Sequence, residues 1–233
     1  MLTLAIDTAT SDLVVGLVDA SPRPAPEAPR AELREEVIIR GTRHHNEQLV
    51  PAVLDTLRRA GAEMGDLEAV VVGCGPGPFT GLRVGMATGQ AFADALGIPV
   101  YGVCSLDAIW RGMREALPEA TDFLVATDAR RREVYWARYT ATERVAGPDV
   151  IAPAELEIPP IVEAINVPVR LSESLASDHP APRFDLAPTP VALVESAALG
   201  EPPEPLRALY LRRPDAQVPR SRPLSPAIPR SDS

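Results

Sequence analysis

The pattern of apolar and polar positions divides the first part of the chain into short strands and amphipathic helices. Short runs rich in Val, Ile and Leu are typical of strands, and the unbroken run AVVVGC is typical of a parallel strand buried on both faces. The predicted strands are Leu2–Ile6, Leu13–Asp19, Glu32–Arg40, Ala69–Cys74 and Ile98–Val103, and the predicted helices are Asn46–Ala60 and Gly81–Leu96. This βββαβαβ order, which begins with antiparallel neighbours, predicts a mixed sheet flanked by helices.

The helix predicted at Asn46–Ala60 has an apolar stripe at i, i+1, i+4, i+5 and i+8, which is the helical period. Pro51 falls within it and is tolerated only near the first turn or at a kink. The stripe consists of Leu49, Val50, Val53, Leu54 and Leu57.

The second half of the chain repeats the opening pattern of the first. Predicted strands at Phe123–Thr127 and Glu133–Tyr139 are joined through the short turn Asp128–Arg132, just as the first strand pair is joined after Asp7. We therefore interpret the chain as two lobes of duplicated design. The predicted regions are an N-terminal lobe (1–104), a C-terminal lobe (105–213) and a disordered tail (214–233). In the second lobe we expect helices at Ser105–Ala116 with Ser105 as N-cap, Ala154–Ile165 and Pro190–Leu199, and a last ordered segment at Leu206–Leu211.

An unusual loop follows the strand predicted at Ala69–Cys74. Gly75-Pro76-Gly77-Pro78 cannot continue a strand, and its glycines allow sharp, partly left-handed turns. Thr80 then stands where a helix N-cap is expected. The residues of this motif loop are Gly75, Pro76, Gly77 and Thr80.

Small residues recur at every fourth position of the helix that follows the loop. Residues four apart share one helix face, so this face is bare backbone, although each interior glycine costs roughly 1 kcal/mol relative to alanine. Two interpretations stay open, and both can hold together: close packing of the helix on the chain's own sheet, and contact with a second helix, which can come from another chain. We call this set the glycine ridge; it comprises Gly81, Gly85, Gly89, Ala93 and Gly97.

Composition narrows the classes of function. A net charge of −9 argues against an autonomous nucleic-acid binder, whose surface would be basic. No apolar run approaches the roughly 18 residues of a membrane span, and the N-terminus lacks the basic region of a signal peptide, so we expect a cytoplasmic protein without membrane contact. Cys74 and Cys104 provide no disulfide framework and are expected to be reduced core thiols.

Few residues indicate catalysis. His44 and His45 are adjacent and point about 100° apart on a helix, which disfavours a shared metal, and His179 is isolated. The turns Asp7–Asp12 and Asp128–Arg132 contain no glycine to cradle a phosphate. We therefore expect no catalytic, cofactor or metal site in this chain.

The run Arg130, Arg131 and Arg132 adds bulk and charge to the second turn. It has two interpretations, a solvated turn or a contact with RNA or another phosphate.

Four segments together resemble the bacterial TsaB proteins. LAIDTAT, HHNEQLVPAVLDTL, GPGPFTGLRVG and DARRREVYWARY occur in the same order, and the resemblance runs from Leu2 to Tyr139 with a weaker echo at Leu206–Arg212. It implies an actin/hexokinase/Hsp70-like (ASKHA) α/β fold of two lobes, each with a mixed five-stranded sheet. It also implies a non-catalytic subunit that binds and activates a metal-bearing TsaD-type threonylcarbamoyltransferase, which forms threonylcarbamoyladenosine beside the anticodon of tRNA.

The resemblance further implies partners and the surface that meets them. Metal and ATP are expected on partner subunits, a TsaD-type catalytic subunit and a TsaE-type ATPase, while a nucleotide at a subunit interface stays open. The chain is expected to dimerise with itself when alone and to meet tRNA only through the complex. The partner interface is expected on the helices 46–60 and 81–96, at Leu49, Val53, Leu57, Gly81, Gly85 and Gly89.

Two other functions remain as alternatives. One is an independent phosphotransferase or hydrolase of the same fold, against which the turns without glycine argue. The other is a homodimeric interaction protein outside tRNA modification, which the same glycine ridge would serve.

Overall fold

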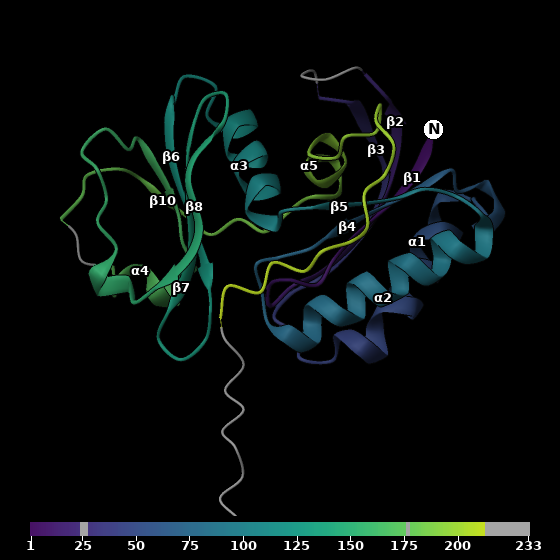
Figure 1. Ribbon diagram of the computed structural model, residues 1–233, viewed down its shortest axis with the longest axis horizontal. Coiled ribbons are helices and arrows are strands. Elements are labelled where there is room, and N and C mark those ends of the chain that lie inside the picture. The colour runs from purple at the N-terminus through teal and green to yellow at the C-terminus, as the bar shows by residue number, and fades with distance from the viewer. Residues whose placement is uncertain (24–27, 176–177, 213–233) are drawn as a thin grey trace, which may run out of the picture.

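The chain folds into two lobes, each built on a five-stranded mixed sheet (Figure 1). The structure is a computed structural model that describes residues 1–23, 28–175 and 178–212, so the tail predicted over 214–233 lies outside the described residues. Within the described ranges, no helix is both long enough and apolar enough to cross a membrane.

The first sheet confirms the predicted βββαβαβ order. Its strands are β1 (Leu2–Asp7), β2 (Leu13–Ser21), β3 (Arg30–Ile39), β4 (Ala69–Gly73) and β5 (Val100–Val103), and its connections carry α1 (His45–Ala60), the short 3-10 turn η1 (Met64–Asp66) and α2 (Phe79–Leu96). The spatial order is β3-β2-β1-β4-β5. The first three strands pair antiparallel, whereas β1, β4 and β5 are parallel.

Helices cover both faces of the first sheet, which explains why β1 and β4 are buried along their whole length. On one face α1 and α2 lie side by side (Figure 1), and Val53 and Ala93 pack into one core with Val70 and Val72. On the other face α3 (Ser105–Ala116) and α5 (Pro190–Glu195) add side chains such as Leu193 to a second core. Strands buried on both faces read as continuous apolar runs, which is the observed pattern.

The second sheet repeats the topology of the first. Its strands are β6 (Asp122–Asp128), β7 (Val134–Thr140), β8 (Arg144–Ile151), β9 (Ala164–Asn166) and β10 (Arg183–Phe184), with the 3-10 turn η2 (Pro153–Glu155) and the short helix α4 (Val169–Ser172) in its connections. The spatial order β8-β7-β6-β9-β10 matches β3-β2-β1-β4-β5 strand for strand. The duplicated design read from the strand pairs is therefore confirmed.

Several second-lobe elements differ from the prediction. The helix expected at Ala154–Ile165 is wrong: the segment begins in η2 and ends in β9, because Pro159 and Pro160 prevent a continuous helix. The strand β8 was not predicted, because it contains Gly147 and Pro148, two residues that are disfavoured inside strands. The structure accommodates both residues on an edge strand whose register with β7 shifts.

Two helix starts also differ. The helix α2 begins at Phe79 after Pro78, so Thr80 lies inside the first turn and is not the N-cap. The helix α3 follows Cys104, and the Ser105 hydroxyl donates to Asp7 at 2.5 Å instead of capping the helix. In both cases the helix starts without a side-chain cap.

The last described segment returns to the first lobe, although the sequence placed residues up to 213 in the second. The helix α5 packs on the first sheet, and Pro190 lies where a Cβ on Gly16 of β2 would collide with it. Further along, Leu206 packs against the first core, and the Leu209 N–H donates to the Cys74 carbonyl at 2.9 Å. We call residues 206–212 the C-terminal strap.

Candidate functional site

The motif loop between β4 and α2 packs tightly against the turn that follows β1. A Cβ on Gly77 would lie 2.8 Å from the Cα of Ala9, so only glycine fits there. Gly75 has a φ of +95°, which favours glycine, and its carbonyl accepts from the Ser105 N–H at 2.7 Å. The Tyr135 hydroxyl donates to the Gly77 carbonyl at 3.5 Å, so the loop also contacts the second lobe.

Three members of the glycine ridge, Gly81, Gly85 and Gly89, face the interior of the first lobe, whereas Gly97 caps the end of α2 and is exposed. A Cβ on Gly81 would collide with the Thr8 carbonyl oxygen, one on Gly85 with the Thr8 hydroxyl, and one on Gly89 with Val72. The Thr8 hydroxyl donates to the Gly81 carbonyl at 2.7 Å. Of the two interpretations, close internal packing is therefore the correct one. The prediction that these three glycines meet a partner is wrong, because Thr8, in the turn after β1, and Val72 of β4 already occupy that space.

The α1 residues of the predicted interface are likewise internal. Leu49, Val53 and Leu57 are almost fully buried in the core of the first lobe. The three residues are spaced so that they lie on the side of α1 that faces the core, not on its exposed side. The prediction that they contact a partner is corrected for the same reason as the glycines.

The same helices nevertheless carry exposed apolar and small side chains on their outward faces. Val50 and Leu54 of α1 are 42% and 53% exposed. On α2 the exposed positions include small side chains at every fourth residue, a second stripe opposite the glycines. We call these positions the outer helical face; its members are Val50, Pro51, Leu54, Ala87, Ala91 and Ala95.

A wider reading of the α1 pattern could have found the outer helical face. An apolar stripe that occupies i, i+1, i+4, i+5 and i+8 is wider than the part of the helix surface that packs against the core. Its inner members are the three core residues, and its outer members, Val50 and Leu54, are left in solvent. On α2 the alanines gave no such signal, because alanine is common in any helix.

Asp7 is the acid that ends β1, and the chain encloses it completely. It is fully buried, accepting from the Ser105 hydroxyl at 2.5 Å and from the Ala9 N–H at 2.8 Å. Burial raises the pKa of Asp7 to about 6, against these two hydrogen bonds, which lower it. A Cβ on Gly73 would collide with the Asp7 carboxylate, so the space next to it is filled. This carboxylate is not accessible to a ligand.

The corresponding turn of the second lobe is exposed and has an unusual backbone. Arg130, Arg131 and Arg132 have φ values of 59°, 53° and 64°, a left-handed conformation that is costly for residues other than glycine. The Arg130 N–H donates to the Asp128 carboxylate at 2.9 Å, and the Glu133 N–H to the Arg130 carbonyl at 3.0 Å. All three arginines are exposed.

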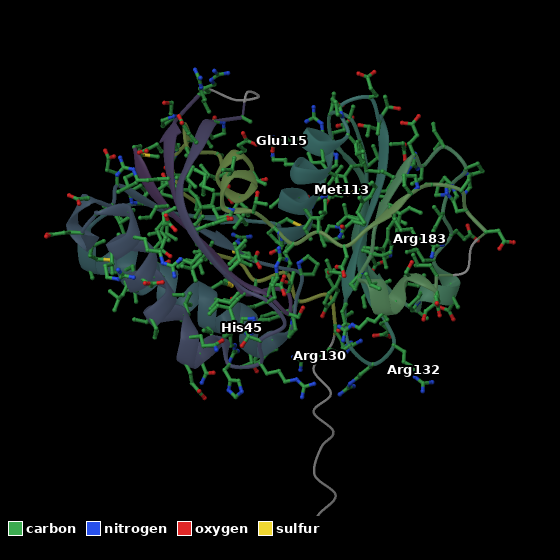
Figure 2. All side chains as sticks on the ribbon, turned by 180° about the vertical axis from the view of Figure 1, so that it is seen from behind. His45, Met113, Glu115, Arg130, Arg132 and Arg183 are labelled. Carbon is green, nitrogen blue, oxygen red and sulfur yellow. The ribbon has the colours of Figure 1, made fainter. Side chains whose placement is uncertain are left out.

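The two acids of this turn, Asp128 and Glu133, each form an ion pair with an arginine from another segment. Asp128 pairs with Arg170 of α4, and Glu133 pairs with Arg212 of the C-terminal strap. The strap thereby connects the turn to the first lobe. Figure 2 shows Arg130 near His45, at the start of α1, on one edge of the molecule.

The histidines and cysteines do not gather into a site. Burial lowers the pKa of His45, while the carbonyl groups of Asp12 and Thr10 oppose this change. Burial raises the pKa of Cys74 to about 11 and that of Cys104 to about 12, so both are protonated thiols near neutral pH. In the described part of the chain, no group of three or more His, Cys, Asp or Glu side chains is placed to hold a metal ion.

Two lobes of equal strand order, each a mixed five-stranded sheet with helices, define an actin/hexokinase/Hsp70-like two-lobed α/β fold, as the sequence predicted. The family profile described as "TsaD: tRNA N6-adenosine threonylcarbamoyltransferase" matches residues 33–192. That is well over half of the chain, and the chain belongs to this family.

Comparison with individual proteins supports the same family assignment. An uncharacterised protein of Mycobacterium tuberculosis is 44% identical over 221 residues, which cover 92% of this chain and 93% of that protein. The tRNA threonylcarbamoyladenosine biosynthesis protein TsaB of Escherichia coli is 39% identical over 101 residues, which cover 43% of each chain. The crystallised YeaZ of Pseudomonas aeruginosa has a TM-score of 0.67 at 26% identity, covering 85% of this chain and 90% of that one. The resemblance to TsaB proteins seen in the sequence is thus confirmed.

Proposed function

We propose that the chain is a non-catalytic subunit that binds and activates a TsaD-type threonylcarbamoyltransferase during the formation of threonylcarbamoyladenosine in tRNA. The observation that carries the proposal is the outer helical face, an apolar and small-residue surface on two adjacent helices of a chain that belongs to the TsaD family. The partial similarity to Escherichia coli TsaB supports the same assignment.

The outer helical face has the chemistry of a helix-docking surface. Alanine side chains at every fourth position allow a second helix to approach α2 closely, and Val50 and Leu54 provide apolar area on the neighbouring helix α1. The predicted helices are therefore retained as the docking elements, while the residues that face the partner are replaced by those of the opposite helix faces.

The buried Asp7 supports a role without catalysis by this chain. A carboxylate that is enclosed, hydrogen-bonded and biased toward its protonated form is not available to bind a phosphate-bound cation or to act on a substrate. We propose that metal and ATP belong to the TsaD-type subunit and to a TsaE-type ATPase. A homodimer formed through the same face is the proposed state of the isolated chain.

The direct test is threonylcarbamoyl transfer to unmodified tRNA by the purified TsaD-type enzyme and the other pathway components, with and without this chain. We expect transfer to depend on the chain. Full transfer in its absence would contradict the proposal, and turnover of a nucleotide by the chain alone would favour an independent enzyme.

The docking face is tested by Leu54→Glu, which places a charge in the centre of the proposed contact. We expect the stimulation of transfer to fall about tenfold or more, because truncated or charged interface anchors typically lose at least 2 kcal/mol. The matched control is Leu33→Glu on β3, another exposed leucine outside the outer helical face. Equal losses in both variants, with unchanged thermal unfolding, would place the interface elsewhere.

A further inference from the structure

One edge of the molecule combines exposed arginines with exposed aromatic rings from three separate segments. The turn after β6 contributes Arg130, Arg131 and Arg132, the start of α2 contributes Phe79 and Arg83, and the C-terminal strap contributes Tyr210. We call these six residues the arginine–aromatic face. They lie on a chain whose net charge is −9, so this local excess of positive charge runs against the composition.

Direct contacts between its residues and the C-terminal strap link the two halves of the face. The Phe79 and Tyr210 rings lie 5.2 Å apart between centroids, and the Arg83 guanidinium stands 3.9 Å above the Phe79 ring. The Arg83 Nε also donates to the Tyr210 hydroxyl at 3.3 Å. Two residues further along the strap, Arg212 pairs with Glu133 beside the arginine turn. The strap therefore joins the aromatic half to the cationic half.

The backbone of the arginine turn is costly to hold, which points to a use for the side chains that it presents. Three successive arginines adopt the left-handed conformation that glycine would adopt without penalty. Neighbouring hydrogen bonds and ion pairs keep the turn in this shape. Of the acids beside the turn, Asp128 pairs with Arg170 and Glu133 pairs with Arg212.

We propose that the arginine–aromatic face binds single-stranded or looped RNA directly, with phosphates on the arginine turn and a base stacked on the Phe79–Tyr210 pair. Arginines that track a backbone beside aromatic stacking platforms are the features that bind unpaired RNA. An acidic peptide would use the arginines but has no base to stack on the exposed rings. The choice of RNA rests on the proposed function, and the inference goes beyond it because there the chain meets tRNA only through its partner.

The first experiment measures binding of a fluorescein-labelled 15-nucleotide polyuridine to the full chain by anisotropy, over a series of salt concentrations. The variant Arg130→Gly/Arg131→Gly/Arg132→Gly removes three charges, and glycine suits the left-handed turn. We expect binding at least about tenfold weaker and a salt slope lower by about 2, since each single-strand phosphate contact contributes roughly 0.7. The matched control is Arg34→Gln/Arg58→Gln/Arg59→Gln, three exposed arginines on β3 and the far end of α1.

An equal loss in the control would mean that binding follows net charge, which overturns the proposal. The aromatic half is tested by Tyr210→Leu, for which we expect about a tenfold loss on polyuridine and little change on a 15-base-pair RNA duplex. Equal losses on both probes would overturn the stacking. If a 15-residue polyglutamate competes as well as the RNA, the face binds an acidic peptide and the proposal is wrong.

These measurements use the chain without its proposed enzyme partner. If transfer proves independent of the chain, the proposed function is contradicted, but the polyuridine measurement still tests RNA binding by the arginine–aromatic face. If transfer depends on the chain but the triple glycine variant binds polyuridine like the unmodified protein, only the present inference is overturned.

Discussion

The two lobes share one strand order but differ in what connects their strands. In the first lobe the connections to β4 and β5 contain the 16-residue α1 and the 18-residue α2, which cover a whole face of the sheet. In the second lobe β9 and β10 have three and two residues, and the four-residue α4 lies between them. Strand pairing thus sets the common topology, whereas connection length decides which lobe has one face of its sheet covered by two long helices.

The two lobes also differ at the acid that ends the first strand of each sheet. Asp7 and Asp128 each end the first strand of their sheet, and each accepts an N–H from two residues further along. Asp7 is enclosed and its charged form is disfavoured, whereas Asp128 is partly exposed and paired with Arg170. Equivalent positions at the ends of paired strands therefore differ in burial and in the groups that contact the acid.

The largest expected effect comes from filling the glycine ridge of the first lobe. Gly85→Leu would drive a side chain into Thr8, and we expect the free energy of unfolding to fall by about 3 kcal/mol, the upper part of the range for overpacked cores. Urea unfolding measures the change. The control Ala87→Leu, on the exposed side of the same helix, should change stability by no more than about 0.5 kcal/mol. A well-folded Gly85→Leu variant that has lost only partner binding would contradict the internal packing.

Asp7 gives the next effect, a pH dependence of stability. Its pKa is about 6 in the folded chain against 3.8 for an ordinary aspartate, so between these values the folded state retains a proton that the unfolded state releases. The contribution is complete below pH 3.8 and is lost as the pH rises through about 6, which amounts to roughly 3 kcal/mol at 1.36 kcal/mol per unit.

Asp7→Asn tests this assignment, because an amide can accept from Ala9 and donate to the Ser105 hydroxyl. We expect the variant to be more stable than the unmodified chain at pH 7.5, and its thermal unfolding to vary less between pH 4 and 7. A variant that follows the same pH profile as the unmodified chain would show that Asp7 is not the responsible group.

The smallest effect is expected at the equivalent acid of the second lobe. Asp128→Asn removes one exposed ion pair with Arg170 but keeps the hydrogen bond to the Arg130 N–H, so stability should fall by about 0.5 kcal/mol. Chemical denaturation at low and high salt measures it. A loss as large as that for Gly85→Leu would mean that the two turns are more alike than their burial indicates.

Some parts of the candidate site could be predicted from the sequence and others could not. The motif loop was predictable because Gly75 and Gly77 signal a backbone that other residues cannot follow. The aromatic pair was not, since Phe79 and Tyr210 are separated by 131 positions and meet only because the C-terminal strap crosses back to the start of α2. No local pattern records a contact of that kind.

Local periodicity was sufficient for the order of strands and helices along the first lobe and for the duplicated strand pair of the second, because burial on one or two faces is reflected directly in the spacing of apolar residues. It could not say which surface the small residues of α2 meet, since a stripe of glycines permits close approach by any neighbour. The tertiary structure decided this: Thr8, in the turn after β1, lies under Gly81 and Gly85, Val72 of β4 lies under Gly89, and the alanines of the opposite face are exposed.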